Sequence, residues 1–297
     1  MKQPTVVVIG SINMDLVTES PRVPEKGETI LGEKFHLIPG GKGANQAVAA
    51  ARLGAQVKII GAVGTDSFGT ELLAHLKNEG IDVSNVKPVT SVSTGVASIT
   101  LSEGDNRIIV VPGANHLITP NDIEQCESVF ANADVCVLQL EIPLETVEKA
   151  VEIAKKHGIK VILNPAPAQT LPLFLLEKVD YLTPNEHERP LIFGDTQEEA
   201  FIEKLIVTEG KAGVSYYKQG KKVQVSGYSV DVVDTTGAGD TFNGAFAVAI
   251  SRGMSLAEAC AFANAAAALS VTQLGAQTGM PTQEQLEQFL QEQEAKQ

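Results

Sequence analysis

The sequence contains no tryptophan and only three cysteines in 297 residues. Cys126, Cys136 and Cys260 have no paired spacing and no histidine close to them in sequence, which indicates buried thiols in a reducing compartment. The five histidines also lack the spacing of a metal site. No apolar stretch approaches the ~20 residues that span a bilayer, and the opening residues, MKQPTVVVIGS, lack the pattern of a signal peptide. We therefore expect a soluble cytoplasmic protein with no membrane partner.

Basic residues are also scarce, with 23 Lys and Arg against 36 Asp and Glu and a formal net charge of −13. This balance excludes binding of nucleic acid, or of an anionic membrane surface, through general electrostatics. A bound phosphate would have to be held by local backbone N–H groups and a few placed cations.

Short apolar runs alternate with helical patterns through most of the chain. The runs at 6–9, 57–60, 135–140, 161–163, 181–182 and 205–207 predict buried strands. Helical patterns lie between them at 43–53, 67–79 and 144–157, and Gly64–Gly69 predicts a helix N-cap. Strands and helices in this order predict an α/β fold with a mainly parallel central sheet covered on both faces. The last third predicts closely packed helices at 242–252 and 256–271, where small residues are frequent, and an amphipathic helix at 282–297.

Two regions interrupt this alternation. Residues 28–39 are strand-like, and residues 93–111 predict two strands around a turn at 103–106. Such a hairpin is either a lid or interface element, or an edge extension of the main sheet. With no repeat, linker or composition shift in view, we expect one domain over 1–297.

The stretch DTTGAGDTFNGAF at 234–246 places small residues directly before an acid at the start of an apolar helix. Amides near Gly237, Ala238 and Gly239 would point to the N-terminus of that helix, where an anion is favoured. Such donors stabilise a phosphoryl group in transfer, and Asp240 could take the proton of an attacking hydroxyl. The alternative is that Asp240 only caps its helix.

Two further Gly-containing stretches precede helices or follow strands. PGGKGANQA at 39–47 is not a Walker A loop, yet its glycines permit close backbone approach, and Lys42 and Asn45 add donors at a helix start. GSINMD at 10–15 follows the first strand, and Asn13 and Asp15 face the same way in extended chain. They could hold adjacent hydroxyls at the carboxyl edge of the sheet. A Gly-rich turn and an Asx turn are the plain alternatives.

Polar groups also end three successive strands, at Glu141, Asn164 and Asn185. One such residue is usually a helix cap, whereas three along one sheet edge suggest a site. The turn at 208–213, TEGKAG, suits a nucleotide that passes close to the backbone, or is a plain turn.

Taken together, these motifs resemble the ribokinases within the ribokinase-like carbohydrate kinases. The resemblance runs nearly end to end and rests on GSINMD (10–15), PGGKGANQAVAAARLG (39–54), LQLEIP (138–143), NPAPA (164–168), TPNEHE (183–188), VTEGKAG (207–213) and DTTGAGDTFNGAF (234–246). It implies a Rossmann-like three-layer sandwich with a small β-sheet lid, formed by about 14–38 and 91–112, through which two subunits pair as a homodimer.

The resemblance implies transfer of the ATP γ-phosphoryl group to the O5 hydroxyl of D-ribose, giving D-ribose 5-phosphate and ADP. Asp240 would be the base, and Gly237, Ala238 and Gly239 would form the anion hole. The sugar would be held by Asn13, Asp15, Gly41, Lys42, Asn45, Glu141 and Asp240. ATP would be held by Asn185, Thr208, Glu209, Gly210, Lys211, Ala212, Gly213, Gly239 and Asn264. Glu188 would place Mg²⁺ through water. A monovalent cation, K⁺, would lie at Asp234, Thr236, Ser270, Gln273, Gly275 and Gly279.

The segment 189–204 departs from the resemblance because it is shorter than the ribokinase pattern requires. Pro190 follows Glu188 by two residues and fits only the first turn of a helix. We predict a trimmed or distorted element on the nucleotide side that lowers stability or loosens ATP binding. Two alternatives stay open: a kinase for another sugar or a nucleoside, such as deoxyribose, and a sugar- and nucleotide-binding relative that has lost catalysis.

Overall fold

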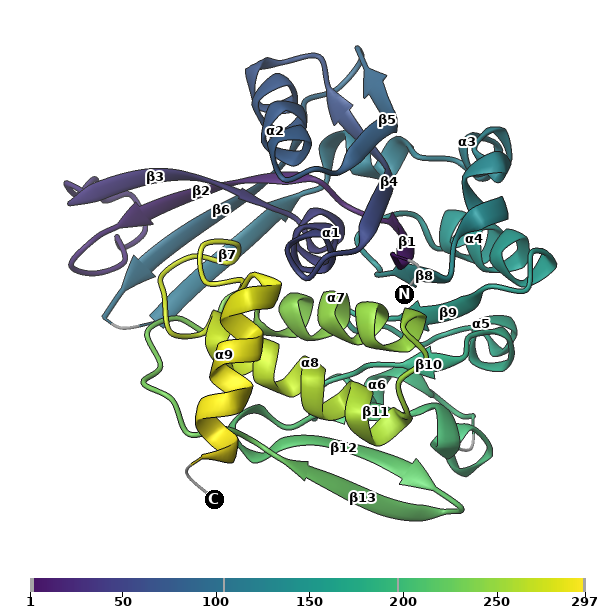
Figure 1. Cartoon of the computed structure of the whole chain (residues 1–297). Coiled ribbons are helices and arrows are strands. Elements are labelled where there is room, and N and C mark those ends of the chain that lie inside the picture. Colours follow the sequence, from purple (N-terminus) through teal and green to yellow (C-terminus); the bar gives the residue numbers. More distant parts are fainter. Residues whose placement is uncertain (1–2, 104, 197, 296–297) are drawn as a thin grey trace.

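The computed structural model describes residues 3–103, 105–196 and 198–295 (Figure 1). Its central sheet has six parallel strands in the order β10-β9-β8-β1-β4-β5. These strands are β1 (Thr5–Ile9), β4 (Gln56–Gly64), β5 (Asp82–Val89), β8 (Val135–Leu138), β9 (Lys160–Leu163) and β10 (Tyr181–Leu182). The parallel sheet predicted from the apolar runs is thereby confirmed. β8 ends two residues earlier than predicted because Leu140 N–H donates to the carbonyl of Ala166 instead of continuing the ladder.

Helices cover both faces of this sheet, so alternate residues of a strand enter different cores. In β1, Val6 and Val8 lie in the core beneath one helical layer, and Val7 and Ile9 lie in the core beneath the other. The first layer consists of α1 (Lys42–Arg52), α2 (Ser67–Asn78), α7 (Ala238–Ser251), α8 (Leu256–Ser270) and α9 (Gln283–Glu294). The second consists of α3 (Pro120–Gln125), α4 (Leu144–Lys156) and α5 (Leu173–Lys178). The three-layer arrangement expected from the sequence is therefore present.

The predicted helix starts have local causes. Asp66 caps α2, as its side chain accepts from the N–H of Gly69. Thr282 caps α9 in the same way, by accepting from the N–H of Gln285. The predicted close packing of the small-residue helices is also present, since a Cβ added to Gly244 of α7 would lie 2.6 Å from Cβ of Ala49 in α1. This close approach places the start of α1 against the start of α7.

A second sheet of four strands extends away from the central one (Figure 1). Its order is β3-β2-β6-β7, with β2 (Asn13–Glu19) parallel to β6 (Gly95–Ser102) and antiparallel to β3 (Lys34–Gly40), and with β7 (Asp105–Val111) antiparallel to β6. It is a separate sheet, so the alternative of an edge extension of the main sheet is wrong. The strand expected over 28–39 begins only at Lys34. The predicted turn at 103–106 includes Gly104, which lies outside the described residues.

A third sheet lies beyond β10 and contains β11 (Ile206–Thr208), β12 (Gly213–Lys218) and β13 (Lys221–Ser226), all antiparallel. Bridges from Leu182 to Leu205 and from Asn185 to Thr208 connect it to the central sheet. The segment before β11 contains a four-residue helix, α6 (Arg189–Ile192), with Pro190 in its first turn, and a 3₁₀ helix, Glu198–Lys204. Among its described residues the segment therefore has only short helical elements, and it buries Ile192, Phe193 and Phe201 while Leu191 stays exposed.

None of the helices within the described residues combines the length and the apolar character that crossing a membrane requires.

Candidate active site

Asp240 lies in the first turn of α7 with 7% of its surface exposed. Nδ2 of Asn45 donates to its Oδ2 at 2.9 Å, and Nε2 of Gln46 donates to its Oδ1 at 3.0 Å. Both donors belong to α1, which reaches α7 because Gly244 leaves room for it. The two amide N–H₂ groups donate to both carboxylate oxygens and so fix the orientation of the carboxylate.

The N-terminus of α7 opens beside this carboxylate. Its N-cap, Gly237, has a left-handed φ of 78°, and within the described residues no side chain caps the helix. The N–H of Ala238 donates to the carbonyl of Thr235 at 3.2 Å, whereas Gly239 has open space where a Cβ would stand. The first N–H groups of an α-helix have no acceptor within the helix and attract negative charge. The three residues predicted to form an anion hole therefore share an open helix end.

Residues expected to hold a sugar meet where β2 and β3 pair. Asn13 is opposite Gly40 in the ladder, and Nδ2 of Asn115 donates to Oδ1 of Asn13 at 2.7 Å. A Cβ on Gly40 would lie 2.4 Å from Oδ2 of Asp15, so the glycine provides the space for that carboxylate. Asn115 thus fixes the side chain of Asn13 through its oxygen, so the amide N–H₂ of Asn13 points away from Asn115.

Glu141 joins this group from the segment that follows β8. Its Oε2 accepts from the main-chain N–H of Lys42 at 3.1 Å and from the hydroxyl of Ser11. Gly41, the N-cap of α1, has a φ of 89°, and a Cβ there would lie 2.7 Å from the main-chain N of Asn13. The start of α1 therefore gathers all the residues predicted to hold the sugar, namely Asn13, Asp15, Gly41, Lys42, Asn45, Glu141 and Asp240.

Lys42 is surrounded by negative charge. Burial acts to lower the pKa of its ammonium, but the carboxylates of Asp240, Glu141, Glu188 and Asp15 outweigh burial and raise it. One cation among four carboxylates leaves this group of side chains with a net negative charge. Such a group favours a further cation or a ligand rich in hydroxyls.

Asp15 responds most strongly to this environment. Burial, followed by the charges of Glu141 and Asp240, raises the pKa of its carboxyl from 3.8 to about 7, with Lys42 acting in the opposite direction. Asp15 also lines a cavity of about 650 Å³ between the four-stranded sheet and the segments around Thr236 and Gly275. A perturbed acid at the edge of a large cavity is typical of a functional site.

The residues expected to hold ATP lie along the third sheet. Asn185 pairs with Thr208 in a parallel bridge, and Nδ2 of Asn264 donates to the carbonyl of Ser226, which is opposite Gly213. The turn Gly210–Ala212 is an exposed 3₁₀ helix. The structure thus brings these stretches of the chain together along one side of α8.

The carboxylate of Glu209 is not directed to that open turn. Its Oε1 accepts from Oγ of Ser215 and from Nζ of Lys222, both at 2.7 Å. Burial acts to raise its pKa, and the bonds from Lys222 and Ser215 outweigh burial and hold it below the ordinary value. Glu209 therefore has a structural role for its side chain, which leaves its backbone as the part that a ligand could contact.

Glu188 stands between the two groups of residues. Its Oε2 accepts from the main-chain N–H of Asn185 at 2.9 Å, and Oδ1 of Asn185 accepts in turn from the N–H of Glu188 at 2.8 Å. Burial raises the pKa of Glu188, and the nearby charge of Asp240 acts in the same direction. Its position suits a carboxylate that attracts a hydrated cation near the phosphates.

Five of the six residues expected to bind K⁺ fall into two groups whose members are in contact. One group is Asp234 with Thr236 and Gly275, and the other is Ser270 with Gly279. Oδ1 of Asp234 accepts from the hydroxyl and N–H of Thr236, and Oδ2 accepts from the N–H of Gly275 at 2.8 Å. A Cβ on Gly279 would lie 2.0 Å from the carbonyl oxygen of Ser270. Gln273 is exposed.

Asp234 carries the negative charge among the residues expected to bind K⁺. Burial acts to raise the pKa of Asp234, and the bonds from Thr236 and Gly275 outweigh it and keep the carboxyl below its ordinary range. No ion pair joins Asp234 to a basic side chain among the described residues. An ionised carboxylate is an oxygen ligand of the kind that hard cations take.

Several residues of the site were not singled out from the sequence. Gln46 holds Asp240, Ser11 holds Glu141, and Asn115 holds Asn13. Asn243 fastens the first turn of α7, because its Nδ2 donates to the carbonyl of Gly239 at 2.8 Å. The signal available in the sequence was polar amides inside otherwise apolar stretches, as at Gln46 within Ala44–Ala51.

Comparison with known proteins identifies the class of enzyme. The model of the pfkB family carbohydrate kinases matches residues 3–283. The chain belongs to that family. The ribokinase of Bacillus subtilis is 50% identical over 293 residues, which cover 96% of this chain and 99% of that protein. The deoxyribokinase of Salmonella typhi is 38% identical over 300 residues, covering 96% of this chain and 98% of its own.

A solved structure of Arabidopsis thaliana ribokinase, complexed with ribose and ATP, superposes with a TM-score of 0.87 at 35% identity and covers 98% of this kinase and 99% of the plant chain. The expected resemblance to the ribokinase-like carbohydrate kinases, and with it the expectation of an ATP-dependent sugar kinase, is confirmed.

Proposed function

We propose that this kinase transfers the γ-phosphoryl group of ATP to the O5 hydroxyl of D-ribose, giving D-ribose 5-phosphate and ADP. The observation that carries the proposal is the placing of the buried Asp240 carboxylate beside the open N-terminus of α7. The likeness to the Bacillus subtilis ribokinase, and to the plant ribokinase that was solved with ribose and ATP, supports the choice of substrates.

In this proposal Asp240 accepts the proton of the sugar hydroxyl as that oxygen attacks the γ-phosphorus. Asn45 and Gln46 keep the carboxylate oriented during the attack. The N–H groups of Gly237 and Gly239 would face the charge that develops on the phosphoryl oxygens, at the end of α7 where a helix favours negative charge. The N–H of Ala238 would join them by exchanging the carbonyl of Thr235 for a phosphoryl oxygen. Lys42 adds a positive side chain to the carboxylates that surround it.

The sugar hydroxyls would be held by Asn13, Asp15, Gly41, Lys42, Asn45 and Glu141, which surround the start of α1. The nucleotide would lie along α8 and the third sheet, against Asn185, residues 208–213, Gly239 and Asn264. For Glu209 we assign this role to the backbone, because its side chain is bonded to Ser215 and Lys222.

Two cations complete the proposal. Glu188 would hold Mg²⁺ through water, and a bound Mg²⁺ supplies charge that neutralises the phosphates. Asp234, Thr236, Ser270, Gln273, Gly275 and Gly279 would hold K⁺, with most of the ligands supplied by main-chain carbonyls. The positive charge of these two cations would allow a chain with a net charge of −13 to bind phosphates.

We propose that the four-stranded sheet, which includes 14–19 and 34–38 of the segment 14–38 and most of 91–112, is a lid that closes over the sugar and excludes water. Water would otherwise compete with the sugar as phosphoryl acceptor. The lid also presents apolar side chains to solvent, with Phe35 60% and Ile109 69% exposed. A large apolar surface of this kind suits pairing of two subunits through their lids.

The experiment that tests the function is release of ADP from MgATP, with and without K⁺, across ribose, deoxyribose, fructose and adenosine. Ribose-dependent turnover that K⁺ increases supports the proposal. Preference for deoxyribose would favour the deoxyribokinase alternative, for which the 38% identity to the Salmonella typhi protein is the specific observation. Ribose binding without turnover would mean that the chain is a binding relative.

That last alternative rests on the short segment 189–204. Its structure is well packed: the rings of Phe193 and Phe201 stack at 6.4 Å, and Arg189 pairs with Glu198 and lies 5.5 Å from the ring of Tyr217. Lower stability or weaker ATP binding stays a prediction, and a melting temperature and ATP KM ordinary for the family would contradict it. A cytoplasmic location also stays a prediction, and the three cysteines, all free thiols, suit a reducing compartment.

A further inference from the structure

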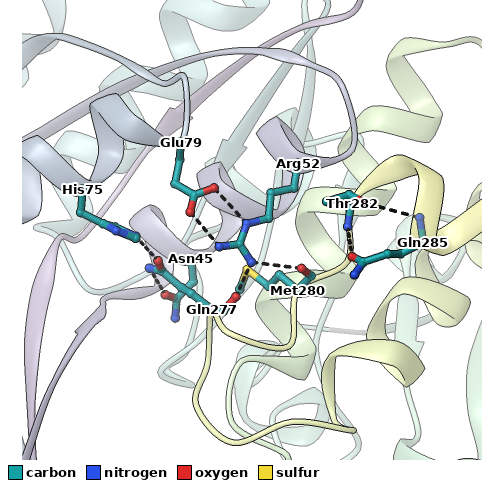
Figure 2. A network of polar contacts seen from close by, with 8 residues as sticks. All are labelled: Asn45, Arg52, His75, Glu79, Gln277, Met280, Thr282 and Gln285. Atoms are coloured by element: carbon teal, nitrogen blue, oxygen red, sulfur yellow. Dashed lines mark hydrogen bonds and ion pairs between the residues drawn. The ribbon is translucent and has the colours of Figure 1, made fainter.

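A chain of three side chains, Asn45, Gln277 and His75, leads away from Asp240, and Figure 2 shows these three side chains. Nδ2 of Asn45 donates to Asp240 at 2.9 Å, and Oδ1 of Asn45 accepts from Nε2 of Gln277 at 2.8 Å. Oε1 of Gln277 is in turn 2.7 Å from Nε2 of His75 in α2. The chain therefore connects two helices and the segment between α8 and α9 to the predicted base.

Hydrogen-bond chemistry gives this chain one direction. An ionised carboxylate can only accept, so Asn45 must present its N–H₂ to Asp240 and its oxygen to Gln277. Gln277 must then present its N–H₂ to Asn45 and its oxygen to His75, which carries the hydrogen on Nε2. Each amide has one donating and one accepting end, so reversing any of them places two donors or two acceptors face to face.

Burial makes the direction costly to reverse. Asn45 is 6% and Gln277 4% exposed, so water cannot replace a lost partner. The second oxygen of Asp240 is also bonded to a side-chain amide whose oxygen has a partner. Gln46 donates to this oxygen, and Oε1 of Gln46 accepts from Nε2 of Gln139 at 2.6 Å. Both oxygens of the base are thus held by amides whose own oxygens are occupied.

The backbone of Gln277 is fastened independently of its side chain. Nη1 of Arg52 donates to the carbonyl of Gln277 at 2.5 Å and to that of Met280 at 3.0 Å (Figure 2). Arg52 is itself held by two bonds to Glu79, at 2.9 and 2.7 Å. The loop keeps its anchor when the side chain of Gln277 changes, so the two roles can be separated by mutation.

We propose that Gln277 is a positioning residue for the phosphoryl transfer, acting through Asn45 on Asp240, with His75 fixing its orientation. The inference rests on the proposed function, since it takes Asp240 as the base. Gln277 does not touch the reacting atoms. Its role is to keep the N–H₂ of Asn45 directed at the base and not toward the segment 271–281.

The test compares Gln277→Glu with Gln277→Leu. Glutamate keeps the shape and the acceptor for His75, but it attracts the N–H₂ of Asn45 and turns the Asn45 oxygen toward Asp240. We expect kcat with ribose to fall about 10–100-fold in Gln277→Glu, and by less in Gln277→Leu, with the KM for ATP within about threefold of wild type. A merely structural role predicts that the fall in kcat follows the loss of melting temperature in both variants, because leucine loses both hydrogen bonds and glutamate buries a charge.

The pH profile gives a second reading. Once protonated, the introduced carboxyl donates again to Asn45, so the ratio of variant to wild-type kcat should rise as the pH falls in Gln277→Glu and stay flat in Gln277→Leu. The charged or titratable groups that face this position are His75 from α2, Asp240 from α7, and Arg52 with its partner Glu79. Arg52→Gln is the matched control: it loosens the same loop, and we expect a lower melting temperature with an unchanged pH profile.

A measurement that does not depend on turnover separates the positioning role of Gln277 from the proposed kinase function. The side-chain amide resonance of Asn45 in a ¹⁵N spectrum should shift in Gln277→Glu and keep its position in Arg52→Gln. An inactive wild-type chain would overturn the proposed kinase, whereas an unmoved Asn45 resonance in Gln277→Glu, or wild-type kcat in that variant, would overturn the positioning role.

Discussion

A Cβ atom on Gly10 would lie 1.9 Å from Oε1 of Gln139. Gly10 follows β1 and Gln139 follows β8, so the two neighbouring strands end in direct contact. The absence of a side chain at Gly10 allows Gln139 to reach Gln46, which holds one oxygen of Asp240. The end of the central sheet thereby determines the orientation of the predicted base.

Gly10→Ala should therefore impair both folding and activity. The clash with a buried amide places the variant among overpacked cores, which lose about 1–3 kcal/mol of unfolding free energy. We expect this loss in chemical denaturation, with a fall in kcat. The double variant Gly10→Ala/Gln139→Ala removes the clash with Gln139 but keeps a 2.9 Å approach to Cα of Gly43 and loses the donor to Gln46, so stability should recover only in part and kcat should not. Recovery of both would show that Gln139 only fills space.

Asp240→Asn tests the base. The amide that replaces the carboxylate can accept at one end only, so it faces an N–H₂ of Asn45 or Gln46 with its own N–H₂. We expect kcat to fall at least about a thousandfold, together with a cost of about 1–3 kcal/mol in unfolding free energy from the mismatched donors. Ribose and ATP affinities measured by calorimetry should remain measurable. Turnover within tenfold of wild type would mean that another group takes the proton.

Asp15→Asn should make the protein more stable at high pH. The pKa of Asp15 is raised from 3.8 to about 7, first by burial and then by Glu141 and Asp240. The folded state binds this proton more tightly than the unfolded state, so the stabilisation is complete below pH 3.8 and is lost as the pH rises to about 7. Asparagine carries no charge, and its advantage over wild type should reach on the order of 2 kcal/mol at pH 8.

The measurement is the melting temperature of wild type and Asp15→Asn at pH 5 and pH 8, with the larger difference expected at pH 8. Asp82→Asn is a control of opposite sign, because bonds from Ser84 hold the pKa of Asp82 below its ordinary value. That variant should lose a little stability at pH 8. An Asp15→Asn difference that does not change with pH would contradict the raised pKa.

The proposed cation site gives a prediction that needs no turnover. Asp234 is ionised and bonded to Thr236 and Gly275. A cation that binds the folded state raises its stability by mass action, so KCl should raise the wild-type melting temperature more than choline chloride at equal ionic strength. Asp234→Asn should abolish that difference. An equal response of both proteins to K⁺ would place the cation elsewhere.

Sequence reasoning predicted the sheet and the helix that begins just before Asp240 because both have local signatures. Buried parallel strands are continuous apolar runs. Glycines directly before a helix, as before Asp240, are typical of a helix start that binds an anion. The start of β3 was predicted too early because β2 ends at Glu19, which bonds to the N–H of Glu33, and leaves no strand for residues 28–32 to pair with. Strand bounds depend on such pairing, which is not local.

The residues that hold the base were harder to predict. Gln46 meets Asp240 across 194 positions, and Gln277 meets Asn45 across 232. A buried amide has no periodicity of its own, and its partner is decided by how closely two helices approach. Gly244 controls that approach between α1 and α7, and a single glycine in an apolar helix does not reveal in the sequence which helix it admits.

The most direct measurement of the proposed reaction uses ribose labelled with ¹³C at C5, MgATP and K⁺, with the product observed by ³¹P and ¹³C NMR. Wild type should give a phosphate ester that shows ¹³C–³¹P coupling to C5, and Asp240→Asn should give none in the same time. A product phosphorylated at another carbon, or equal product from both proteins, would contradict the assignment of Asp240 as the base for the O5 hydroxyl.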